Sequence, residues 1–173
     1  MGKQDYDEIV LDEDKHAVYT GLPSIATFAF LLRILAVAGF TPFRQLSVKN
    51  TLLVLLLKLK LGLKNRDIAY RMGISYTHIS SILSRRLTIL ASACETLIRW
   101  PSREAVITNM SNCFRSASTT IRRTCLVVDC FELHTERPKA LTPRAQMWSN
   151  YKSHSTVKFL VGISPMGSVS FLS

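Results

Sequence analysis

Residues 65–87 constrain the fold of this chain more than any other stretch. Ala69 is followed four residues later by Gly73, where a sharp turn favours a residue without a Cβ. Ile79 and Ile82 then recur at the i and i+3 spacing, which predicts the buried side of a second helix packed on the small side chain of Ala69. This spacing predicts a helix-turn-helix.

Most of the other side chains of the second helix are polar, and Ser75 suits the N-cap at its start. The second helix of such a motif enters the major groove, where residues near its N-terminus contact base edges and basic residues contact phosphates. The alternative is an ordinary helical hairpin with a solvated polar face. We predict base contacts by Tyr76, Thr77, His78 and Ser81 and phosphate contacts by Arg85 and Arg86, all off the buried stripe.

The charge of the chain favours a polyanionic partner, although a generic basic protein is an alternative. The net charge is +10, and the first 16 residues hold six acids and two lysines, so the remaining chain carries +14. Residues 1–18 therefore read as an acidic, mobile lead-in. A weaker alternative is that this segment screens the basic face until DNA displaces it.

The four cysteines are not spaced for a zinc site. Cys94, Cys113, Cys125 and Cys130 form no CxxC pair and no knuckle with histidine, so we expect no structural zinc. The acidic N-terminus does not resemble a secretory signal, which favours a reducing compartment with free thiols.

Two apolar stretches, residues 23–40 and 46–63, predict helices, the second of them buried on most sides. A membrane hairpin is the alternative. A span needs roughly 20 mostly apolar residues. Arg33 lies at the centre of the first stretch and Lys58 and Lys60 lie within the second, and central charges are disfavoured in a bilayer. We therefore do not expect membrane insertion.

The pattern of the sequence changes from helix-like to strand-like near residue 118, where we place a domain boundary. A short apolar run over residues 125–130 predicts a buried central strand. Residues 134–155 form a polar, proline-containing stretch, and residues 157–164 and 169–172 predict two more strands. Three strands with no helix after them make an incomplete sheet. The predicted class is α+β, with residues 1–18 as lead-in, 19–118 as a helical domain and 119–173 as the incomplete domain.

The chain resembles eukaryotic DDE-superfamily endonucleases, transposases related to the Harbinger group, from Tyr19 onward. The block Trp148–Gly162 is the most specific part of this resemblance, because a helix-turn-helix is common to many DNA-binding proteins. The residues that carry it are Tyr19-Thr20-Gly21-Leu22-Pro23, Leu61-Gly62-Leu63, Asp67-Ile68-Ala69-Tyr70-Arg71, Gly73-Ile74-Ser75, Val128-Asp129-Cys130, Glu136-Arg137-Pro138, Trp148-Ser149-Asn150-Tyr151-Lys152 and Val157-Lys158-Phe159-Leu160-Val161-Gly162.

The resemblance implies an RNase H-like domain in which three acids hold divalent metal, Mg²⁺ or Mn²⁺. The first acid matches Asp129, and the second Asp and the Glu of the family would follow the third strand, beyond Ser173. We do not expect Glu132 to replace them, because side chains alternate along a strand. Glu136, in the loop, is an equally weak substitute. Lone loop histidines such as His134 and His154 are more often solvated than bound to metal.

We therefore predict the N-terminal part of a transposase-like protein that binds double-stranded DNA and is inactive as given. Without the resemblance, Asp129 would be read as a strand-end carboxylate paired with Arg122 or Arg123. The alternatives are a stand-alone helix-turn-helix DNA-binding or regulatory protein, an enzyme completed by acids elsewhere, and a small membrane-associated protein built on residues 22–63. The resemblance implies assembly into a homo-oligomer on DNA. We expect the nucleus as location and no small-molecule substrate.

Overall fold

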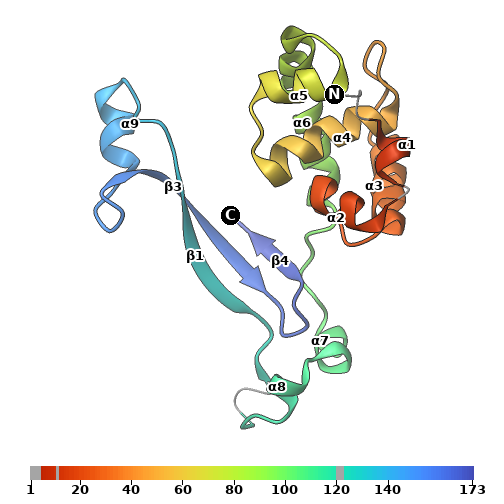
Figure 1. The fold of residues 1–173 in the computed structure, drawn as a ribbon. Helices are drawn as coiled ribbons and strands as arrows, with labels where there is room; N and C mark the ends of the chain where they lie inside the picture. The colour runs from red at the N-terminus through yellow and green to blue at the C-terminus, as the bar shows by residue number, and fades with distance from the viewer. Residues whose placement is uncertain (1–4, 11, 120–122) are drawn as a thin grey trace. The chain divides into compact units, whose positions relative to one another are not determined.

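The computed structural model describes residues 5–10, 12–119 and 123–173. The chain forms two compact units, which meet in sequence at Thr96 and Leu97 (Figure 1). The first unit is helical, and the second combines short helices with a sheet. The predicted α+β class is thus confirmed. This division falls earlier in the chain than the predicted boundary near residue 118. Two short helices, α7 (Arg103–Asn109) and α8 (Asn112–Arg115), belong to the second compact unit.

The first unit begins with two helices, α1 (Tyr6–Ile9) and α2 (Glu13–Thr20), where the sequence indicated a mobile lead-in. Only 3% of Tyr6 is exposed, and its backbone N–H donates to Asn50 Oδ1 at 2.8 Å. The ammonium group of Lys49 lies 2.8 Å from the carboxylate of Asp7. The acidic segment differs from the prediction because Tyr6 and Ile9 are buried, Asp5 and Asp12 cap the two helices, and Asp7 pairs with Lys49 on α4.

Three rings join this segment to the rest of the helical unit. Tyr6 stacks on Phe28 with ring centroids 3.9 Å apart, and His16 meets both rings edge-on. Burial, then the charge of Asp7, raises the pKa of the Tyr6 phenol to about 12. Burial also lowers the pKa of His16, which is 1% exposed. Neither the Tyr6 hydroxyl nor His16 Nε2 has a hydrogen-bond partner among the described residues.

The helical unit is built around α4 (Val48–Leu61), which packs beside α3 (Ile25–Val37). Ser24 and Ser47 cap the two helices by accepting backbone N–H groups at 3.2 Å. Every residue from Asn50 to Leu57 is buried, as the nearly continuous apolar run predicted. The two predicted helices are therefore confirmed, with α4 forming the core of the unit.

Two further helices, α5 (Asn65–Met72) and α6 (Tyr76–Glu95), complete the first unit. Both pack on α4. The second unit opens with α7 (Arg103–Asn109) and α8 (Asn112–Arg115).

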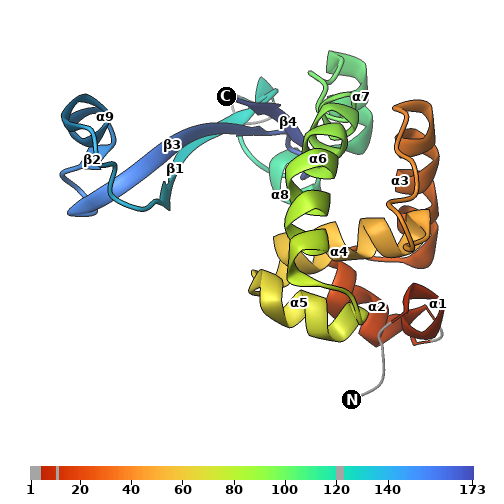
Figure 2. The same ribbon diagram turned by 90° about the horizontal axis from the view of Figure 1, so that it is seen from above.

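The sheet of the second unit is antiparallel and centred on β3 (His154–Ile163). Along one edge of β3 runs β1 (Val127–His134), and Figure 2 shows the two strands side by side. On the other edge, β4 (Val169–Leu172) and β2 (Trp148–Ser149) pair with different parts of β3. The three predicted strands are present, and β2 is an addition.

The prediction that the first strand is buried and central is wrong. Seven of the eight residues of β1 are exposed, and among the described residues this strand pairs only with β3. The apolar run correctly signals a strand, but its burial depends on neighbours that the run does not specify. Gly162 on β3 shows where packing is tight, because a Cβ there would lie 2.4 Å from Leu126 Cδ2.

The polar stretch between β1 and β3 is folded. It contains α9 (Leu141–Gln146) and β2, and Figure 1 shows α9 at the end of the β1–β3 pair. Of the described helices, none alone is long and apolar enough to cross a bilayer. By length and composition only, the bent pair of α2 and α3 passes that test.

Candidate nucleic-acid interface

The turn between α5 and α6 has the conformation that the sequence predicts. Gly73 follows α5 with a φ of +63°, a left-handed conformation in which a residue with a Cβ is strained. The N–H of Ile74 donates to the carbonyl of Ala69 at 3.1 Å and closes the turn. Ser75 Oγ accepts the N–H of His78 at 3.3 Å, as expected of an N-cap.

The inner side of the motif is apolar and closed. Ile79 and Ile82 on α6 are fully buried, as are Ile68 and Met72 on α5, and Ala69 lies between them with 6% exposure. A small residue at 69 therefore permits the close approach of the two helices. The predicted helix-turn-helix is confirmed at the level of its fold.

The outer side of α6 presents polar groups. Tyr76 is 53% exposed, and Thr77 and Arg85 are exposed as well. Ser81 is half-buried on the same side of the helix. Ser75 Oγ and Thr77 Oγ1 lie 2.9 Å apart, so the Thr77 hydroxyl is held at the start of the helix. Four of the six predicted DNA-contacting residues are thus exposed or partly exposed on α6: Tyr76, Thr77, Ser81 and Arg85.

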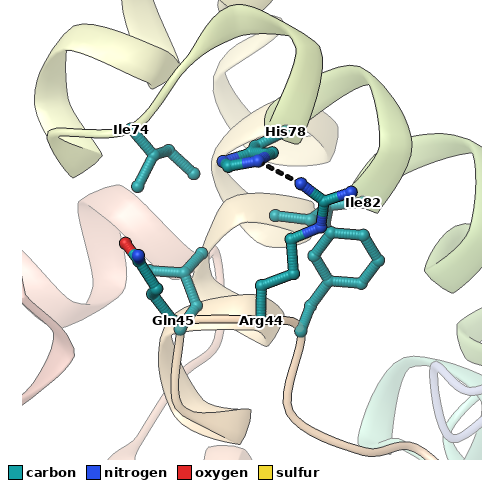
Figure 3. A pocket seen from close by; sticks show the side chains of 7 residues that line it. Arg44, Gln45, Ile74, His78 and Ile82 are labelled. Atoms are coloured by element: carbon teal, nitrogen blue, oxygen red, sulfur yellow. Dashed lines mark hydrogen bonds between the residues drawn. The ribbon is translucent and has the colours of Figure 1, made fainter.

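His78 is placed differently from these four. Its ring lies in a small pocket between the turn and the loop before α4, lined in part by Ile74, Ile82 and Gln45 (Figure 3). A hydrogen bond joins His78 Nε2 to a guanidinium nitrogen of Arg44. The imidazole of His78 is therefore engaged in a contact within the protein. Arg44, the partner in that contact, is added to the candidate interface.

Arg44 is a residue that sequence reasoning missed. It occupies a left-handed conformation with φ of +55° in a tight turn closed by a bridge between Phe43 and Leu46. Its guanidinium carbon lies 5.8 Å from the ring centroid of Phe43. An arginine in this conformation is uncommon, and neither its type nor its neighbours in the sequence signal it.

The prediction that Arg86 lies off the buried stripe is wrong. Its guanidinium carbon lies 5.8 and 5.7 Å from the ring centroids of Phe40 and Phe43, and Nη2 donates to Thr41 Oγ1 at 2.8 Å. Arg86 Nε is buried without a partner among the described atoms. The reason is helical phase. Arg86 is four residues after Ile82, and this i+4 spacing returns to the buried side of the helix.

Asp129, the predicted first acid, is exposed on β1. Its Oδ1 accepts the N–H of Cys130 at 2.8 Å. Of the described basic residues, Arg123 included, none forms an ion pair with it, and Arg122 lies outside the described residues.

Glu132 lies in a different environment, as the alternation of side chains along the strand predicted. It accepts a hydrogen bond from Thr156 Oγ1 at 3.0 Å and lies 3.7 Å from Lys158 Nζ. Hydrogen bonding from Ser149 and Thr156, together with the charges of Lys158 and Lys152, lowers the pKa of the Glu132 carboxyl. Glu132 is thus committed to contacts within the sheet.

The described residues do not by themselves form a divalent-metal site. Within ranges 5–10, 12–119 and 123–173, no three His, Cys, Asp or Glu side chains gather as metal ligands. The rings of His134 and His154 meet edge-on at 4.9 Å, a contact between two rings and not a ligand set. Asp129 is a single carboxylate, whereas Mg²⁺ sites use several oxygen ligands.

Two segments of the chain match known families. Residues 44–95 match the helix-turn-helix of DDE superfamily endonuclease, and residues 128–173 match DDE superfamily endonuclease. Neither a curated protein nor a solved structure matches the chain significantly. The first match begins at Arg44 and so includes the loop that contacts His78. The chain therefore has one segment that is similar to the helix-turn-helix of these endonucleases and a second that is similar to the endonucleases themselves.

Proposed function

We propose that this chain binds double-stranded DNA through the outer side of α6. The observation that carries the proposal is the exposed polar side of a helix whose opposite side is closed by Ile79 and Ile82, within a segment matched by a DNA-transposition family. In such a motif the second helix enters the major groove. The family matches imply DNA as the partner, and they support the motif without identifying its contacts.

We assign the contacts by position along α6. Tyr76 and Thr77 lie in its first turn and Ser81 in its second, the part of a recognition helix that meets base edges. Arg85 lies one turn further, where an exposed guanidinium suits a phosphate. His78 is an additional base contact in this proposal if its ring leaves Arg44, and Arg44 itself is a phosphate contact. Arg86 acts by holding α6 to the loop before α4.

We further propose that the parent protein is a eukaryotic, Harbinger-like transposase of the nucleus, with an RNase H-like endonuclease domain, that assembles as a homo-oligomer on DNA. DDE superfamily endonucleases depend in general on divalent metal. Asp129 is then one carboxylate of a Mg²⁺ or Mn²⁺ site. The described residues supply no complete ligand set, so a chain of these 173 residues alone is expected to bind DNA without cleaving it.

Two alternatives make different predictions. A stand-alone helix-turn-helix regulator binds duplex DNA and shows no metal-dependent cleavage under any condition. An enzyme completed by acids from other sequence or a partner chain nicks DNA with Mg²⁺ or Mn²⁺, and this nicking is lost in Asp129→Ala. The exposed β1 position of Asp129 is the observation that keeps the second alternative open.

Hydroxyl-radical footprinting tests the proposal at the level of side chains. Tyr76 on α6 and Phe30 on α3 are each 53% exposed, so the free chain should oxidise both readily. On adding duplex DNA we expect protection of Tyr76 and unchanged oxidation of Phe30. Fluorescence anisotropy verifies that the duplex is bound. If Tyr76 is then oxidised equally with and without duplex, the contact lies elsewhere and the proposal is rejected.

A further inference from the structure

The chain between β1 and β3 folds into a tip, residues 134–158, that belongs to a different unit from the helix-turn-helix. The N–H of Thr135 donates to Ser155 O at 2.9 Å, and the N–H of Thr156 donates to Met147 O at 2.7 Å. These two bonds connect both ends of the α9–β2 segment to β3. The hairpin tip is thus a built element with fixed ends.

A buried polar cluster supports the base of the hairpin tip. Ser149 and Thr156 are almost fully buried, and Thr156 Oγ1 donates to Glu132 at 3.0 Å. Ser149 Oγ also accepts the N–H of Lys152 at 3.3 Å. Since Ser149 is the neighbour of Trp148 on β2, this cluster fixes the backbone from which the indole projects.

An open pocket lies on the hairpin tip. It is lined by Arg137, Leu141, Arg144, Ala145 and Trp148. Trp148 is 47% exposed and Leu141 is 77% exposed, so two large apolar side chains of the pocket face solvent. Arg144 Nε donates to the carbonyl of Pro138 at 3.2 Å, which holds the loop that carries Arg137 against α9.

The charges around this pocket are mostly positive. Residues 135–158 contain five basic side chains and one acid, Glu136, and the pocket lining contains two arginines and no acid. Outside the pocket, the exposed ring of Tyr151 has a cationic contact of its own, with Lys152 Nζ 4.8 Å from its centroid. Guanidinium groups beside an accessible aromatic face complement a ligand that has phosphates and flat rings.

We propose that the hairpin tip binds single-stranded DNA, with one base stacked on Trp148 and a neighbouring phosphate bound by Arg137. A base can stack on an indole only when it has left its own stack, so the pocket selects unpaired or frayed strands over intact duplex. An acidic peptide would satisfy the arginines but not the exposed indole face. Arg144 positions the pocket through its bond to Pro138.

This inference extends the proposed function to a second form of DNA and does not require α6. The two fail separately, because the helix-turn-helix acts on duplex DNA and the hairpin tip on single strands. A chain that binds single strands but not duplex would reject the proposed function alone.

Fluorescence anisotropy of the full chain with labelled oligodeoxythymidylate of about 12 nucleotides tests the proposal, since this oligonucleotide forms no duplex of its own. We expect Trp148→Ala to weaken binding about tenfold, whereas Tyr151→Ala, an exposed aromatic outside the pocket, changes it less than about twofold. Trp148→Phe, which keeps an aromatic face, should retain most of the affinity. Duplex affinity should be unchanged in all three variants.

Tryptophan fluorescence tests the proposal in a chain that keeps Trp148, so the result does not depend on whether Trp148→Ala disturbs β2. The chain has two tryptophans, so Trp100→Phe leaves Trp148 as the only indole. Base stacking should quench its emission as oligodeoxythymidylate binds. Binding without quenching, an unchanged affinity of Trp148→Ala, or equally tight binding of polyglutamate that also depends on Trp148 would overturn the proposal.

Discussion

Arg85 and Arg86 are adjacent on α6 but have opposite surroundings. Arg85 is exposed, whereas Arg86 lies over Phe40 and Phe43 and donates to Thr41. The aliphatic part of such an arginine covers apolar surface while the guanidinium interacts with ring faces. Identical side chains therefore have different roles, one available to DNA and one holding the fold.

Replacement of each arginine by alanine should separate these roles. We expect Arg86→Ala to reduce the free energy of unfolding by about 1–2 kcal/mol, because it removes two ring contacts and a hydrogen bond. Arg85→Ala should leave stability within about 0.5 kcal/mol of the native value. Urea denaturation followed by circular dichroism measures both. Equal midpoints for the two variants would contradict the assignment.

His16 should make the stability of the helical unit depend on pH. Burial lowers the pKa of His16 below its ordinary value of 6.5, so the unfolded chain takes up a proton that the folded chain does not. This contribution is fully present above the unfolded pKa and is lost as pH falls from there through the folded pKa. The free energy of unfolding should therefore decrease as the solution is acidified below about pH 7, until the folded pKa is passed.

His16→Gln should make the free energy of unfolding depend less on pH, because the buried imidazole that must stay neutral in the folded chain is absent. His154→Gln, at an exposed position in the other unit, is the matched control and should keep the native pH dependence. Urea midpoints at several pH values give the comparison. A slope in His16→Gln as steep as in the native chain would show that another group is responsible.

At the scale of elements, the α5–α6 turn depends on one glycine. Gly73 has φ of +63°, where a Cβ crowds the backbone. Gly73→Ala should cost about 1–2 kcal/mol and weaken duplex binding through a displaced α6. Ser80→Ala on the exposed side of α6 should leave stability unchanged. Thermal unfolding checks this, and a Gly73→Ala midpoint equal to that of Ser80→Ala would contradict it.

Elements were predictable where a local pattern determines them. The turn at Gly73, the cap at Ser75 and the stripe of Ile79 and Ile82 each have a local cause, and each was found. The helix α1 was missed because its stability comes from distant partners, the Phe28 ring and the Asn50 side chain. The position of Arg86 could have been predicted from helical phase. The conformation of Arg44 and its contact with His78 could not have been predicted, because no local pattern determines them.

At the scale of the whole molecule, the chain consists of two units with different kinds of core. All residues of the main buried apolar cluster lie between Tyr6 and Ala93. The second unit instead exposes apolar side chains along β1. The sequence showed the change from helix to strand but not the division at Thr96, because α7 and α8 are helical and still belong with the sheet.

A fragment of residues 1–96 should therefore fold alone. It contains the complete apolar cluster together with the helix-turn-helix. We expect a helical circular dichroism spectrum, cooperative unfolding and duplex affinity close to that of the full chain. A fragment that lacks cooperative unfolding would show that the helical unit depends on residues after Thr96.

The most direct test of the account is the affinity of the full chain for duplex DNA as a function of salt concentration. We predict a linear fall of log affinity with log salt between about 50 and 200 mM, because binding at phosphates releases counterions. Arg85→Ala should reduce the magnitude of that slope by about one, whereas Arg33→Ala, an exposed arginine on α3, should not change it. Affinity independent of salt, or equal slopes for native chain and Arg85→Ala, would contradict duplex recognition by α6.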